Sequence, residues 1–140
     1  MLAELFEEED RAREMATHLM NVAKSSRAAA AAEKDSLLAF LRGPMERHMA
    51  YEERAIFPQL EVRGLGEEVQ VAQKQHDAVR EAADRLSHAG PADDVSLLVF
   101  ETARRLLHHT NFEADYIYPE LTHEDWRALM KQTLEQSGGP

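Results

Sequence analysis

The chain has 140 residues, of which 44% are apolar, and this composition predicts one folded domain with a substantial core rather than a disordered chain. Its 26 acidic residues against 16 Lys and Arg give a formal charge of −10, which argues against binding to nucleic acid or to an anionic membrane. Cysteine is absent, which excludes disulfides, thiolate metal ligands and cysteine nucleophiles. No run approaches the roughly 18 apolar residues of a membrane span, so we expect a cytoplasmic protein.

The residue pattern is helical along most of the chain, with Ala, Leu, Glu, Arg and Met dominating and Gly or Pro standing between periodic segments. We predict helices at about residues 2–25, 35–62, 66–88 and 93–119, and a short fifth helix near 123–136. Gly43 and Pro44 fall inside the second segment and should kink that helix. The short connections predict an all-α, up-down antiparallel four-helix bundle over residues 1–122, followed by a short C-terminal helix and flexible tail over 123–140.

Each of the four predicted helices carries an apolar seam at heptad spacing, interrupted near its middle by His or Glu. The interrupting residues are Glu9, His48, Glu52, His76, His109 and Glu113. Burying so many ionisable groups without partners is costly, and no Lys or Arg occupies these inner positions, so we expect a cation. Mixed nitrogen and oxygen donors with two carboxylates that can bridge suit iron or manganese, and zinc less well. Six ligands from four helices exceed what one ion usually takes, which favours two metal ions.

The chain repeats itself. HMAYEERAIFP (48–58) and HTNFEADYIYP (109–119) share a His-x-x-x-Glu pair, which places an imidazole and a carboxylate on one helix face. The first and third helices align in the same way, and Glu9 falls over His76. We therefore interpret the bundle as a duplicated helix hairpin with Glu9 as the first-helix ligand. His18 is the alternative, although it lies beside the seam and reaches the metal layer only if the first helix continues through the polyalanine run.

These motifs, together with His-Asp-x-x-Arg at 76–80, resemble the hemerythrin-like, or HHE cation-binding, domain over about residues 1–120. The resemblance implies an up-down bundle with a non-haem, oxo- or hydroxo-bridged centre of two Fe ions. It also implies dioxygen, peroxide or another small oxidant as the reacting partner. The ligands implied by the resemblance are His48, Glu52, His76, His109 and Glu113, with Glu52 and Glu113 as the bridging carboxylates.

The sequence departs from the family pattern at two positions. The family usually has a first-helix histidine where the repeat places Glu9, and its oxygen carriers have a second third-helix histidine where Arg80 stands. The resulting anionic site should favour ferric iron, so we expect oxygen or peroxide chemistry, as sensor or oxidoreductase, ahead of reversible oxygen carriage. Iron or oxygen binding and storage without turnover, or a purely structural metal such as zinc, remain as alternatives.

Two further residues are candidates for contacts behind the ligands. Tyr116 stands one turn beyond Glu113 on the same seam, where it would hydrogen-bond a ligand or a bound oxygen species. Arg80 follows His76 by four residues and shares its helix face. We expect no catalytic residue beyond the metal site, and a monomer or homodimer.

Overall fold

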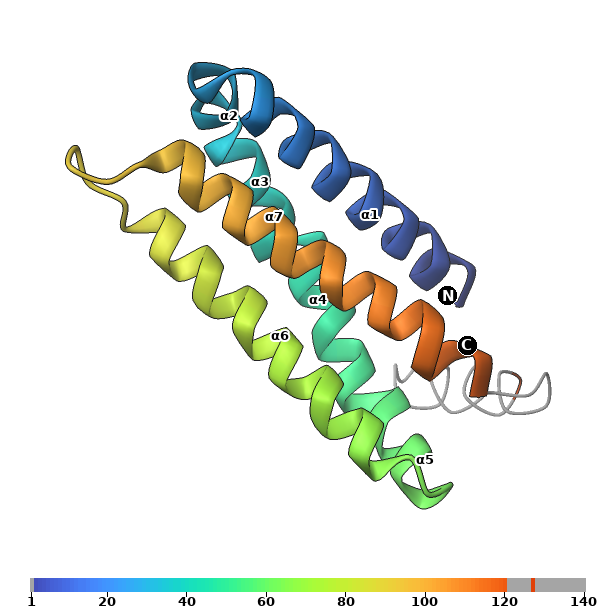
Figure 1. Ribbon diagram of the computed structural model, residues 1–140. Helices are drawn as coiled ribbons and strands as arrows, with labels where there is room; N and C mark the ends of the chain where they lie inside the picture. The colour runs from blue at the N-terminus through green and yellow to red at the C-terminus, as the bar shows by residue number, and fades with distance from the viewer. Residues whose placement is uncertain (1, 121–126, 128–140) are drawn as a thin grey trace.

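The computed structural model describes residues 2–120 and Arg127, and it confirms the all-α bundle (Figure 1). The predicted helix near 123–136 and the tail lie outside the described residues, apart from Arg127. None of the described helices is both long and apolar enough to cross a membrane. The elements are α1 (Leu2–Ser25), α2 (Arg27–Ala32), α3 (Lys34–Arg42), α4 (Pro44–Tyr51), the π-helical turn η1 (Glu52–Ile56), α5 (Phe57–Val62), α6 (Gly66–Ser87), α7 (Val95–Phe112), the π-helical turn η2 (Glu113–Ile117) and the 3-10 turn η3 (Tyr118–Glu120).

Four antiparallel columns make up the bundle: α1, then α3 to α5, then α6, then α7 with η2 (Figure 1). α1 packs against α7, α7 against α6, α6 against α3, and α4 against α1, which closes the ring. The polyalanine run does not extend α1. It forms the separate helix α2, because Ser26 accepts a hydrogen bond from the Ala29 amide and so caps a new helix.

The second column is interrupted at Gly43, as the sequence predicts. α3 ends at Arg42, and Pro44 begins α4 at a position where its missing N–H is not needed. A Cβ atom at Gly43 would lie 3.0 Å from the carbonyl oxygen of Ala39, so this close approach favours glycine. The kink lies one helical turn before His48 and so helps to set the height of that side chain in the bundle.

The buried apolar side chains form two clusters with a polar layer between them. On α1, Leu5 belongs to one cluster and Ala12 to the other, and Glu9 stands between them. On α6 the same order holds for Ala72 and Val79 around a central histidine. The seams predicted from heptad spacing therefore do pack inward, and their polar middles meet at one level of the bundle.

Both His-x-x-x-Glu motifs end in a π-helical turn, which the sequence did not lead us to expect. In η1 the Phe57 amide donates to the carbonyl of Glu52, and in η2 the Tyr118 amide donates to the carbonyl of Glu113. Each wide turn precedes a proline that has no N–H to bond the carbonyl four residues back and whose ring crowds that carbonyl. One extra residue per turn relieves this conflict, and it does so at a predicted ligand in each repeat.

Candidate metal centre

All six predicted ligands are buried and meet in the polar layer of the bundle. None has a relative exposure above the 4% of Glu9. Their donor atoms form two groups, each with all atoms within 4.8 Å of one another, and the two groups share two carboxylates. We name them by their donors. The acidic group is Glu9, His48, Glu52 and Glu113, and the imidazole group is Glu52, His76, His109 and Glu113.

The acidic group is centred on one imidazole nitrogen. His48 Nε2 lies 2.9 Å from Oε1 of Glu9 and 3.3 Å from Oε1 of Glu52. Glu9 comes from α1, His48 from α4 and Glu52 from the π-helical turn that follows α4. Three separate turns of helix thus place carboxylates and an imidazole around a common point.

The imidazole group joins α6 to the end of α7. His76 Nε2 lies 3.3 Å from Oε1 of Glu52 and 3.6 Å from Oε1 of Glu113, and His109 Nε2 contacts the same Glu113 oxygen. The two imidazole rings meet edge to face at a centroid distance of 4.5 Å, and Phe57 stacks on His76 at 5.3 Å. Packing on both sides therefore fixes the plane of the His76 ring.

Each histidine turns Nε2 toward the interior because a second residue holds Nδ1 from outside. His48 Nδ1 pairs with Glu8 at 3.2 Å, and His76 Nδ1 pairs with Glu53 at 2.7 Å. His109 Nδ1 donates to Oε1 of Gln75 at 2.9 Å. An outer hydrogen bond of this kind sets the tautomer, and it leaves the inner nitrogen as an electron-pair donor. Nothing in the sequence indicates these roles for Glu8 and Gln75.

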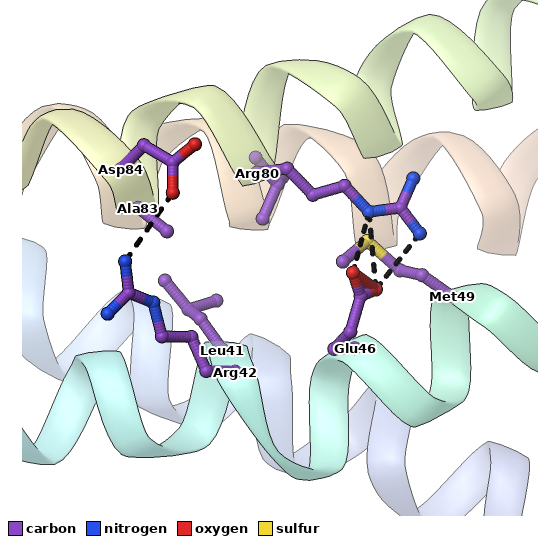
Figure 2. Close-up of a pocket in the computed structure, with 8 residues that line it drawn as sticks. Leu41, Arg42, Glu46, Met49, Arg80, Ala83 and Asp84 are labelled. Carbon is purple, nitrogen blue, oxygen red and sulfur yellow. Dashed lines mark hydrogen bonds and ion pairs between the residues drawn. The ribbon is translucent and has the colours of Figure 1, made fainter.

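Arg80 lies behind His76, at the position where the sequence placed it as a supporting residue. Its guanidinium donates to Glu53 Oε2 at 2.8 Å. It also forms a forked pair with Glu46, which Figure 2 shows. The pair lies beside a cavity of about 310 Å³ between α3, α4 and α6 (Figure 2). Burial opposes ionisation of Glu53, but the Arg80 guanidinium overcomes it and holds the pKa of that carboxyl below its usual value.

Burial and neighbouring charges shift the pKa values of the side chains in the polar layer. Burial raises the pKa of Glu113 well above its ordinary value, and the Glu52 carboxylate raises it further; burial also raises the pKa of Glu9. Burial opposes ionisation of Glu52 too, but the adjacent Glu113 carboxyl and the nearby His48 imidazole hold the pKa of Glu52 well below its usual value. Burial likewise opposes the charged form of His48 and of His76, but the carboxylates around them raise their pKa values to about 12 and about 9. A cation binding here must displace protons from the groups whose pKa is raised.

Several buried donor atoms of the layer have no hydrogen-bond partner of acceptable geometry. They are Glu9 Oε2, Glu52 Oε1, both carboxyl oxygens of Glu113, His76 Nε2 and His109 Nε2. A buried polar group left in this state costs about 1–3 kcal/mol. These atoms are carboxylate oxygens and imidazole nitrogens that converge on two points, which is the donor set that transition-metal ions bind. The residues therefore fit a metal centre.

A family comparison agrees with this geometry. Residues 1–121 match the model of the hemerythrin HHE cation-binding domain. The chain belongs to the hemerythrin HHE cation-binding family. No curated protein and no solved structure gave a significant match.

The first-helix position of this hemerythrin-like layer holds Glu9 and not His18. Glu9 is buried within hydrogen-bonding distance of His48, whereas His18 is exposed on the opposite flank of α1. α1 ends at Ser25 and does not continue through the polyalanine run. Such a continuation was the condition under which His18 would reach the metal layer, so the observed helix end agrees with Glu9.

The tyrosine that contacts a predicted ligand is Tyr118, and the interpretation of Tyr116 needs correction. Tyr116 is 57% exposed and packs on Phe112, whereas the Tyr118 hydroxyl donates to Glu52 Oε2 at 2.7 Å. The π-helical turn η2 is the cause, because a wider turn brings residues four and five beyond Glu113 to the inner face in place of residue three. The proline six residues after each glutamate is the sequence feature that accompanies this shift.

Proposed function

We propose that this protein binds two iron ions, one in the acidic group and one in the imidazole group, and reacts with or senses dioxygen or peroxide. The observation that carries the proposal is the sharing of Glu52 and Glu113 by two four-residue donor groups. Carboxylates that belong to two donor groups can bind two metal ions at once. Helix bundles are known to hold di-iron sites made of carboxylates and histidines in their cores. Bound iron would supply electron-transfer chemistry toward small oxidants.

The protein's own residues orient the proposed metal ligands and keep bulk water away from them. The outer partners of the three histidines keep each Nε2 directed inward, so the donors need little rearrangement to receive a cation. Full burial of Glu52, His76, His109 and Glu113 restricts access to very small molecules and keeps bulk water away. This favours dioxygen or peroxide over a bulky substrate.

The donor balance supports iron ahead of zinc. Three carboxylates accompany three imidazoles, and no thiolate is available in a chain without cysteine. Carboxylate-rich donors suit the harder ferric ion, whereas structural zinc sites usually have four closed ligands and often cysteine. We accordingly propose a redox-active centre rather than a structural one.

The test is the metal content of the purified protein together with its visible spectrum and the rate at which the reduced form is oxidised by dioxygen and by peroxide. We expect about two iron ions per chain, the number held by facing carboxylate and histidine sets in bundles. Glu9→Ala should remove one of them, because Glu9 belongs to the acidic group alone.

Matched variants on the same helix are the controls. Glu7→Ala and His18→Ala change exposed residues of α1 and should leave the iron content unchanged. Iron content that Glu9→Ala leaves intact would remove Glu9 from the centre. A colourless protein with zinc, or one that oxidants do not alter, would overturn the redox proposal and leave a structural metal.

A further inference from the structure

A second cavity, of about 360 Å³, lies on the outer side of the seam between α6 and α7, which run side by side in Figure 1. It is lined by Val71, Lys74, Gln75, Ala78, Arg104, Arg105 and His108. We call it the basic cavity, because it carries Lys and Arg side chains and no carboxylate. None of its residues is a proposed metal ligand.

The positive charges of the basic cavity are unusual in this acidic chain. Among the described residues Arg104 pairs with Glu101 at 2.7 Å, but neither Lys74 nor Arg105 has an ion-pair partner. Acidic residues outnumber Lys and Arg by 26 to 16, so partners are abundant on the surface as a whole. Cationic side chains gathered without counter-charges repel one another and attract anions.

Two donor groups at the cavity are without a protein partner among the described residues, one of them buried and the other open to solvent. Arg105 Nε is shielded from solvent and makes no hydrogen bond to any described residue. Gln75 uses its side-chain oxygen to accept from His109 Nδ1 at 2.9 Å, and its amide NH₂ makes no hydrogen bond within the described part of the chain. Both groups are donors, so an acceptor in the cavity would satisfy them together.

We propose that the basic cavity binds a small organic acid. The carboxylate lies between Lys74 and Arg105 and accepts a hydrogen bond from the Gln75 amide, while the apolar body packs on Val71 and Ala78. The volume falls within the range of small-molecule sites, which combine an apolar surface with a few fixed polar groups. The site goes beyond the proposed iron chemistry and needs no metal ion. It also touches the outer partner of His109, so an occupant would contact the support of one predicted ligand.

The experiment is a titration of the full chain, freed of metal by a chelator, with hexanoate at low ionic strength, followed by calorimetry and by NMR. We expect saturable binding at one site, with the largest NMR shifts at Lys74, Gln75 and Arg105. Lys74→Gln and Arg105→Gln should each weaken binding about tenfold, since each removes one charge-assisted contact. Use of the metal-free protein separates this result from the fate of the iron proposal.

The controls separate a site from general attraction. Lys24→Gln makes the same charge change on an exposed residue of α1 and should leave the affinity unchanged. Lys74 is itself exposed, so its variant decides the matter if Arg105→Gln fails to fold. The proposal is overturned if Lys24→Gln weakens binding as much as Lys74→Gln, if hexanoate does not saturate, or if inorganic phosphate binds as tightly as hexanoate.

Discussion

The acidic group and the imidazole group are supplied by similar sequence motifs but differ in what supports them. In the acidic group, Glu8 is the one described residue that holds the outer nitrogen of His48. In the imidazole group, Glu53 holds His76 and is itself bonded by Arg80, which also pairs with Glu46. The first group has one imidazole and the second has two. The two groups are therefore unequal, although the sequence motifs that supply them repeat.

The difference has a consequence for metal loading. A donor set that is rich in nitrogen and braced by a hydrogen-bond network needs little reorganisation to bind an ion. The acidic group has three carboxylates around one imidazole, and burial and neighbouring charge favour protonation of two of them. We therefore expect the imidazole group to bind the first ion more tightly, and the acidic group to hold the second in a more exchangeable way.

Glu113→Leu is the variant with the largest expected effect, because both groups share this carboxylate. The metal-loaded protein should lose both ions and about 3–4 kcal/mol of the free energy of unfolding, the value for a ligand at roughly 100 to 1,000 times its Kd. The metal-free protein should instead gain about 1–3 kcal/mol, because neither Glu113 carboxyl oxygen has a hydrogen bond. Urea unfolding of both forms measures these opposite signs.

Glu9→Leu is the comparison for that experiment. It alters the acidic group only. About one of the two expected ions should therefore remain, bound by the imidazole group. Equal loss of metal in both variants would contradict the division into two groups. Destabilisation of the metal-free Glu113→Leu protein would show that this carboxyl serves the fold and not a cation.

Arg80→Gln tests whether the contact of Arg80 with Glu53, which supports His76, makes the imidazole group bind its ion first. Without its guanidinium, Glu53 loses the charged partner that helps to orient it against His76 and keeps the Gln73 amide, which donates to it at 3.0 Å. Changes to such outer partners cost about 10–100-fold in metal affinity, and we expect the loss in the imidazole group alone. Competition with a chelator, followed at each step of loading, measures it. Arg85→Gln, which removes an exposed guanidinium of the same helix, should have no effect.

Much of the fold and of the candidate site could be predicted from the sequence, because both depend on helical periodicity. Apolar seams with polar middles placed the six side chains on inner faces, and the 61-residue repeat fixed the two His-x-x-x-Glu pairs at one level. Glu9 followed from its alignment with His76, although a run of four acidic residues suggested a solvated surface. The helix face on which a residue lies follows from its spacing to the apolar residues nearby, so short-range sequence patterns predict it.

The supporting residues could not be found in this way. Glu8 and Gln75 acquire their roles from neighbours that lie 40 and 34 residues away in the chain. The π-helical turns shift the inward face by one residue, which an ideal helix projection cannot represent. Because of that shift, Tyr118 and not Tyr116 contacts a predicted ligand. The proline that accompanies each turn is visible in the sequence, but its outcome depends on local backbone hydrogen bonding.

Tyr118→Phe should have the smallest effect on stability and should act more on the acidic group than on the imidazole group. The Tyr118 hydroxyl donates at 2.7 Å to Glu52, which both groups share, and lies 3.4 Å from Glu9, which belongs to the acidic group alone. Loss of one such hydrogen bond costs about 1 kcal/mol and leaves the ring packed on Phe6. In the metal-loaded protein we expect a changed visible spectrum and faster loss of the second ion, with the first retained. Tyr116→Phe removes an exposed hydroxyl from the same turn and should leave both properties unchanged. If the two variants behave alike, the exchange of tyrosines produced by the π-helical turn has no functional consequence, and the inequality of the two groups comes from their donors alone.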